Sequence, residues 1–165
     1  SKKGVGTTFT VEIPMELTSS EKVEKTKKPA KRKSLKGIKV LLAEDNDLNA
    51  ELAAILLEDS EMIVTRAADG QEVVDLFANH PAGTYDIILM DIMMPKMDGL
   101  QAAKAIRAMQ AERPDAEEIP IIALSANAFA EDVQTSLDAG MNGHVSKPLN
   151  VAEVAKVIAR NLNKS

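Results

Sequence analysis

The sequence contains no cysteine, which excludes a disulfide framework, a thiolate metal site and a cysteine nucleophile. It also lacks an apolar run near the roughly 20 residues that a membrane-spanning helix needs. The first residues, Ser1 to Gly4, do not resemble a secretory signal. Because there is no initiator methionine, we expect a fragment of a longer protein. The fragment itself is expected to be cytoplasmic and without membrane contact, although the full-length protein can carry a membrane anchor.

The composition is that of a soluble globular chain, with 165 residues, 45% of them apolar and 27% charged. This length accommodates one ordinary domain and a tail. Charge is uneven, since residues 21–36 contain eight Lys or Arg and two Glu, a net charge of +6 that leaves −11 elsewhere. The basic run lacks aromatic residues and a helical period, so we interpret it as a flexible linker rather than a nucleic-acid or lipid patch. The acidic remainder argues against nucleic-acid binding by the globular part.

From Gly37 onward, short apolar runs alternate with segments of helical length. The runs at 38–43, 62–67, 85–90, 119–124 and 143–146 predict strands, and the segments near 47–59, 70–79, 98–112, 128–139 and 150–163 predict helices. The first, third and fourth runs are almost continuously apolar, as in strands buried on both faces. Five successive strand–helix units predict a parallel α/β sheet with helices on both sides.

Polar residues gather where these strands end. In a parallel α/β sheet, ligands bind at the carboxyl ends of the strands. The strand ends carry three carboxylates, one hydroxyl and one ammonium, from Glu44, Asp45, Asp91, Ser125 and Lys147. We therefore expect these groups to converge on one rim of the sheet.

Each of these residues also has an ordinary structural explanation. Asp91 suits a turn, Glu44 and Asp45 can cap the next helix, and so can Ser125. Lys147 before Pro148 is compatible with a plain turn. Their joint occurrence at four strand ends favours a functional site.

The chemistry of the group indicates phosphoryl transfer. Three crowded carboxylates need a compensating cation to stay ionised. Oxygen ligands without His or Cys favour Mg²⁺, which accepts a phosphate oxygen as a further ligand. Asp91 could then act as an anionic nucleophile toward phosphorus. Mg²⁺, Lys147 and the Ser125 hydroxyl would stabilise the charge that builds up during transfer.

The blocks "LLAEDN", "LMDIMMPKMDG", "ALSANA" and "VSKPL", in this order and spacing, resemble a response-regulator receiver domain over residues 37–163. The resemblance implies a flavodoxin-like (βα)5 three-layer sandwich with strand order 2-1-3-4-5. It implies that Asp91 is the phosphoacceptor. Asp45, Asp91 and the Met93 backbone carbonyl would bind Mg²⁺ (or Mn²⁺) directly, and Glu44 would bind it through water.

The resemblance also assigns groups that bind the phosphoryl group. Lys147 would pair with it, the Ser125 hydroxyl would move toward it, and the Ala126 backbone amide would donate to it. The Lys147–Pro148 peptide would be cis. Many receivers have Tyr or Phe where this chain has His144, so His144 is either a moving switch residue or a static surface residue.

Residues 1–17, with "GVGTTFTVEIPMEL", look like the last strand of a histidine-kinase ATP-binding domain, and residues 18–36 would be the basic linker. This order resembles a hybrid histidine kinase of a bacterial two-component phosphorelay. The receiver would take a phosphoryl group from a histidine-kinase phosphodonor domain and pass it to a histidine phosphotransfer protein. We expect no kinase activity in this fragment and at most slow Mg²⁺-dependent self-dephosphorylation.

A partner surface is predicted on the segment 47–59. Its five large apolar residues cover more of the helix than one buried face needs, so some must be exposed. They are either isolated surface residues or a docking patch. Similar receivers favour Leu48 and Ile55 as contacts for a partner helix, joined by Met94 and Pro95. A homodimer is a further option, through segments 128–139, 143–146 and 150–163 or by strand exchange of residues 5–13.

Three other functions compete with this interpretation. A Mg²⁺-dependent phosphohydrolase with an aspartate nucleophile usually has a second acid two residues later, where this chain has Met93. A receiver-like module that binds without phosphorylation would normally have lost one of the site residues. A nucleotide carrier would need a Gly-rich phosphate loop after the first strand. Met93 and Asn127 occupy positions that tune phosphoryl loss in the family, and we predict little dependence of hydrolysis on the Met93 side chain.

Overall fold

Five strands and the helices between them account for the part of the chain that the computed structural model describes, residues 34–126 and 129–162. The strands are β1 (Lys39–Ala43), β2 (Ile63–Ala67), β3 (Ile87–Asp91), β4 (Ile121–Ser125) and β5 (Gly143–Ser146). The helices are α1 (Asp47–Glu58), α2 (Gly70–Asn79), α3 (Gly99–Ala108), α4 (Asp115–Glu118), α5 (Ala130–Asp138) and α6 (Val151–Leu162), with a 3₁₀ turn η1 (Met109–Ala111). The predicted kinase remnant at 1–17, residues 18–33 of the linker, Asn127 and Asn163 lie outside the described residues. None of the described helices has the length and apolar character needed to cross a membrane.

The strands pair in parallel in the order β2-β1-β3-β4-β5, which confirms the predicted order. Val40 of β1 is in register with Val64 of β2 on one side and with Ile87 of β3 on the other. All five residues of the central strand β3 are buried. Burial on both faces explains why the apolar runs at β1, β3 and β4 are nearly continuous instead of alternating.

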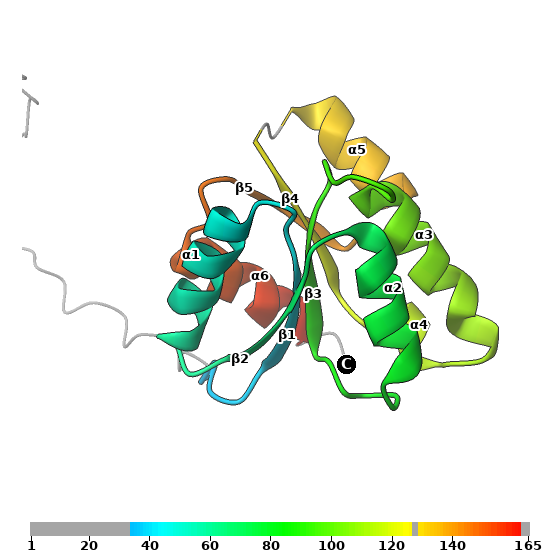
Figure 1. Ribbon diagram of the computed structural model, residues 1–165, viewed down its shortest axis with the longest axis horizontal. Helices are drawn as coiled ribbons and strands as arrows, with labels where there is room; N and C mark the ends of the chain where they lie inside the picture. The colour runs from blue at the N-terminus through cyan, green and yellow to red at the C-terminus, as the bar shows by residue number, and fades with distance from the viewer. Residues whose placement is uncertain (1–33, 127–128, 163–165) are drawn as a thin grey trace, which may run out of the picture. The chain divides into compact units, whose positions relative to one another are not determined.

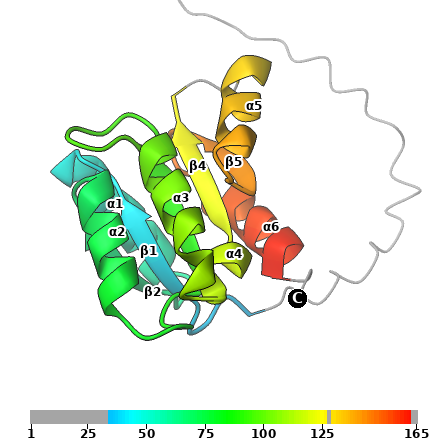
Figure 2. The ribbon, with the colours of Figure 1, turned by 90° about the vertical axis from the view of Figure 1, so that its right-hand side faces the viewer.

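The sheet is the middle of three layers, as Figure 1 and Figure 2 show. Alternate side chains of one strand face opposite layers, so Leu41 and Ile88 pack toward α2 and α3. Val40 and Ile87 pack toward α1 and α6 instead. Each face therefore has its own apolar core, and the carboxyl ends of the strands share one rim.

The segment predicted as a helix over 98–112 corresponds to α3 and the 3₁₀ turn η1, whereas the short helix α4 was not predicted. The helix α3 ends at Ala108, the 3₁₀ turn η1 follows, and the separate short helix α4 lies before β4. Pro114 explains why the helical turns do not continue from η1 into α4, since a residue that precedes proline is disfavoured in the α-helical region. Proline at the start of α4 and acidic residues in its first turn were the available signals for this missed helix.

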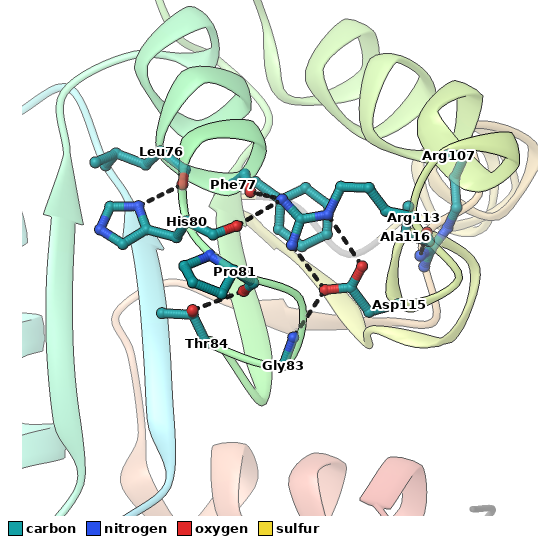
Figure 3. Close-up of polar contacts among 10 residues, drawn as sticks. All are labelled: Leu76, Phe77, His80, Pro81, Gly83, Thr84, Arg107, Arg113, Asp115 and Ala116. Carbon is teal, nitrogen blue, oxygen red and sulfur yellow. Dashed lines mark hydrogen bonds and ion pairs between the residues drawn. The ribbon is translucent and has the colours of Figure 1, made fainter.

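One arginine connects the end of α2, which precedes β3, to the start of α4, which precedes β4. Figure 3 shows Arg113, whose guanidinium donates to both carboxylate oxygens of Asp115 at 2.9 and 3.0 Å and to the backbone carbonyls of Phe77 and His80. It also lies 4.2 Å from the centre of the Phe77 ring. These contacts involve residues that precede β3 and β4, at the opposite end of the sheet from the rim where the strands end.

Candidate functional site

Three carboxylates form one cluster at the carboxyl ends of β1 and β3. Glu44 and Asp45 follow β1, and Asp91 is the last residue of β3. One carboxylate oxygen from each lies within 4.8 Å of the others. Glu44 and Asp91 are buried and Asp45 is exposed. The sheet therefore brings together three acids, one of which comes from a distant part of the chain.

The helix-capping explanation for this acidic segment applies to Asn46. The side chain of Asn46 accepts a hydrogen bond from the Asn49 amide at 3.1 Å and is the N-cap of α1. Glu44 instead accepts a hydrogen bond from the Asn49 side-chain amide at 3.3 Å. Sequence reasoning missed Asn49, although an amide in the first turn of the helix that follows the acidic pair was a usable signal.

The ammonium of Lys147 joins two of the carboxylates. Its Nζ lies 2.6 Å from Asp91 Oδ2 and 2.7 Å from Glu44 Oε2. The backbone of Lys147 is placed by its amide, which donates to the Ser125 carbonyl at 2.8 Å. The Lys147–Pro148 peptide bond is cis. Residues from β1, β3 and the end of β5 thus meet at one point.

The environment changes the pKa of both charged partners. Burial raises the pKa of the Asp91 carboxyl above its ordinary value, against the lowering effects of Lys147 and of the Met93 amide. That amide donates to Asp91 Oδ1 at 3.1 Å. Burial would lower the pKa of Lys147, but its hydrogen bonds with Asp91 and Glu44 outweigh this effect and raise the pKa. Lys147 therefore stays protonated.

The cluster has more carboxylates than ammonium groups among the described residues, since Lys147 pairs with Glu44 and Asp91 and the cluster also contains Asp45. The donor set is made of oxygen atoms, the ligand type that Mg²⁺ and other hard divalent cations prefer. The residues present therefore fit a divalent cation both in charge and in ligand chemistry.

The hydroxyl of Ser125, at the end of β4, lies 2.7 Å from Nε2 of His144 on β5. His144 is half-buried, and its Nδ1 has no hydrogen-bond partner among the described residues. The residue after Ser125, Ala126, is exposed. Of the predicted switch residues, Ser125 and His144 are thus in direct contact in this structure.

The helix α1 buries its alanines and Leu57 and exposes its other large apolar residues. Its buried side chains are those of Ala50, Ala53, Ala54 and Leu57. The other four large apolar side chains are between 40% and 65% exposed: Leu48, Leu52, Ile55 and Leu56. The expected surplus of apolar residues therefore forms an exposed row, here called the α1 face (Leu48, Leu52, Ile55 and Leu56).

The β3–α3 loop, residues 92–98, provides further exposed apolar surface. The Met93 side chain is 79% exposed, and Pro95 is exposed as well. Met94 is half-buried and packs against the core beneath α2 and α3, so only part of its side chain is available to a partner.

Known proteins resemble this chain in sequence and in fold. Residues 40–159 match the family model of the response regulator receiver domain. Hybrid signal transduction histidine kinase B of Dictyostelium discoideum is 39% identical over 152 residues, which are 87% of this chain and 8% of the relative. Sensor protein GacS of Pseudomonas syringae pv. syringae is 37% identical over 122 residues, 74% of this chain and 13% of the relative. The chain thus spans about a tenth of the length of these curated relatives, which come from a bacterium and from a eukaryote and so do not indicate a bacterial source.

Two solved structures add information on the site and on partners. The receiver domain of sensor histidine kinase PA1611 from Pseudomonas aeruginosa has a TM-score of 0.67 and 36% identity, covering 77% of this chain and 98% of the other, and it holds a magnesium ion in its active-site cleft. The receiver domain of Ssk1 from Saccharomyces cerevisiae, solved with the histidine phosphotransfer protein Ypd1, has a TM-score of 0.67 and 28% identity, covering 76% and 89%. Together with the match over 40–159, these relatives show that the chain belongs to the response regulator receiver domain family.

Proposed function

We propose that this receiver domain accepts a phosphoryl group on Asp91 from a phosphohistidine and relays it to a histidine phosphotransfer protein. The observation that carries the proposal is the meeting of Glu44, Asp45, Asp91 and Lys147 at the carboxyl ends of the strands. An aspartate oxygen attacks phosphorus, the bond from phosphorus to the donor imidazole nitrogen breaks, and an aspartyl phosphate forms. The freed electron pair stays on the imidazole nitrogen.

Asp45, Asp91 and the Met93 backbone carbonyl would hold Mg²⁺ directly, and Glu44 would hold it through a water molecule. A bound Mg²⁺ supplies positive charge against the phosphoryl oxygens, and Mn²⁺ has similar ligand preferences. Support comes from the excess of carboxylates in the cluster and from the magnesium ion in the PA1611 receiver.

The remaining residues bind and sense the product. Lys147 would transfer one of its contacts from the Asp91 carboxylate to a phosphoryl oxygen, staying close to both. The Ser125 hydroxyl and the Ala126 backbone amide would bind the other oxygens, and His144 would respond when Ser125 leaves it. The contact between Ser125 and His144 supports the switch role over that of a static surface residue.

Partner helices would dock on the α1 face, with Leu48 and Ile55 as main contacts and with Pro95 and the exposed part of Met94 at its edge. Support comes from the exposure of this face beside Glu44 and Asp45, and from the Ssk1 receiver, which was solved with Ypd1. The similarity to hybrid histidine kinases supports a place in a longer kinase, at its cytoplasmic side.

The test is phosphoryl uptake. The chain is incubated with acetyl phosphate, with and without Mg²⁺, and its intact mass is measured beside those of two variants. We expect a gain of one phosphoryl group in the wild type that needs Mg²⁺ and is lost in Asp91→Asn. The matched control is Asp86→Asn, which removes a carboxylate just before the same strand and should keep the gain.

If the folded wild type gains nothing from acetyl phosphate or from a phosphorylated histidine donor, the proposal is wrong. The domain would then work by binding alone, and its affinity for a histidine phosphotransfer protein would be the same in Asp91→Asn.

A further inference from the structure

The β3–α3 loop leaves the site at Asp91 and returns to it. The amide of Gly99 donates to the Ile92 carbonyl at 3.0 Å, which ties the two ends of the loop together. Gly99 lies so close that a Cβ there would be 2.3 Å from the Asp91 carbonyl oxygen. Between these ends, the Met93 amide donates to the Asp91 carboxylate at 3.1 Å. Because both ends are fixed, the path of the loop sets where the Met93 backbone lies relative to Asp91.

The tip of this loop is attached to another part of the chain, the turn between β2 and α2. Lys96 Nζ lies 2.6 Å from Asp69 Oδ2. Next to this ion pair, the Gly70 amide donates to the Met97 carbonyl at 3.1 Å, and a Cβ at Gly70 would be 2.3 Å from that oxygen. The loop and the turn therefore touch through backbone as well as through side chains.

The backbone of Lys96 has φ of 63°, a left-handed conformation that lysine rarely adopts. Such a conformation persists where surrounding contacts hold it. A tight turn spans Lys96, since the Met97 amide donates to the Pro95 carbonyl at 2.7 Å, and the turn is held from outside by the ion pair with Asp69 and by the hydrogen bond from Gly70 to Met97.

The Asp69 side chain is held in place by burial and by a second hydrogen bond. Its side chain is only 8% exposed, and its Oδ1 accepts the Glu72 amide at 2.9 Å as the N-cap of α2. The hydrogen bond from Lys96 is the largest cause of the lowered pKa of Asp69, so the carboxylate is ionised at neutral pH. One oxygen of Asp69 thus belongs to the helix and the other holds the loop.

We propose that Lys96 and Asp69 form a latch that positions the β3–α3 loop, and with it the Met93 backbone, for cation binding beside Asp91. Lys96 is a positioning residue, since it touches none of the three carboxylates. The inference rests on the proposed function. It implies that the geometry of the site depends on the β2–α2 turn as well as on the strand ends.

The variant Lys96→Asn removes the ion pair and keeps the backbone conformation, because asparagine tolerates the left-handed region but carries no charge. Asp69→Asn keeps a residue that caps helices well and removes the partner charge. The matched control is Lys36→Asn, which removes the ion pair of another exposed lysine, with Glu61 at 3.0 Å, before β1.

The first readout is the affinity of the unphosphorylated protein for Mg²⁺, measured by isothermal titration calorimetry at 0.15 M salt. We expect Lys96→Asn to weaken Mg²⁺ binding about threefold, in the range that a partly exposed ion pair can contribute. The direction of the change in affinity distinguishes positioning from simple electrostatics, because loss of a nearby positive charge by itself would strengthen the binding of a cation. Lys36→Asn should leave the affinity unchanged.

The second readout is hydrogen exchange of the Met93 amide, followed by NMR. A loosened loop exposes this amide more often, so its exchange should be faster in Lys96→Asn and in Asp69→Asn. In the double variant Asp69→Asn/Lys96→Asn, both readouts should match those of Asp69→Asn, since the second change has no ion pair left to break.

Unchanged or tighter Mg²⁺ binding in Lys96→Asn, or the same effect of Lys96→Asn with and without the Asp69 charge, overturns the latch. Failure of the proposed function has another signature, because the wild type would then take up no phosphoryl group while the Mg²⁺ affinities could still differ. The two conclusions can therefore fail separately.

Discussion

The Oγ of Ser125 lies 2.7 Å from the Nε2 of His144, so two residues on adjacent strands share a hydrogen bond beside the acidic cluster. In the His144 tautomer whose Nε2 accepts, Ser125 donates its one proton to the ring and must break this hydrogen bond to donate to a phosphoryl group on Asp91. His144 therefore competes with the phosphoryl group for the same hydroxyl.

His144→Phe keeps a ring and removes the hydrogen bond, so it should speed phosphoryl uptake. A net hydrogen-bond contribution of about 1 kcal/mol corresponds to roughly a fivefold change. Uptake from acetyl phosphate is followed by intact mass. The increase in uptake rate caused by His144→Phe should vanish when Ser125→Ala is also present. An equal increase with and without the Ser125 hydroxyl would show that His144 acts in another way.

The side chain of Met93 should contribute little to loss of the phosphoryl group. It is 79% exposed and its thioether cannot orient an attacking water, whereas its backbone amide contacts Asp91. We expect the phosphoryl lifetime of Met93→Ala to stay within about twofold of the wild-type value. Met93→Asn is measured in parallel, and an unchanged lifetime there would show that the side chain at this position has no influence.

A charge on the α1 face should block transfer to a partner without affecting the site. We expect Ile55→Glu to slow transfer to a histidine phosphotransfer protein by about tenfold or more, as loss of a central apolar contact does. Uptake from acetyl phosphate should not change. The control is Leu137→Glu on α5, which is also exposed. Equal slowing by both variants would contradict docking on α1.

Arg107 should be required for stability. Its guanidinium donates to the carbonyls of Ala116, Ile119 and Gly140, at 2.6, 2.9 and 2.9 Å. Arg107→Met leaves these acceptors without their donor and should lower the free energy of unfolding by about 2–4 kcal/mol. Urea denaturation measures this, with the exposed Lys104→Met on the same helix as control. A loss no larger than that of the control would show that water replaces the guanidinium.

Asp115 should make stability depend on acid pH. Hydrogen bonds from Arg113 lower the pKa of Asp115 below its ordinary value, although partial burial opposes them. A carboxyl whose pKa is lower in the folded than in the unfolded state stabilises the fold above the unfolded value, about 3.9, and loses this effect as the pH falls.

The free energy of unfolding is therefore compared for wild type and Asp115→Asn at several pH values. The variant should be less stable at neutral pH, and the difference should shrink below about pH 4. A difference that stays constant from neutral to acid pH would mean that the Asp115 charge contributes nothing.

Much of the fold was predictable because it depends on local patterns. Buried strands must be apolar and helices must cover them, so the five strands lie within a few residues of the predicted runs. The residues of the acidic cluster were predictable for a related reason, since the carboxyl ends of parallel strands share one rim. The short helix α4 was missed, because four residues are too few to show a helical period.

The sequence by itself thus determined which segments are buried and which chemical groups stand at their ends. The tertiary structure alone decided which groups touch: Lys96 with Asp69, Ser125 with His144, and Arg107 with three carbonyls. It also decided that α1 packs its alanines inward and leaves four large apolar side chains exposed. The physical reason is that periodicity acts over a few residues, whereas these contacts depend on strand register and helix packing between distant segments.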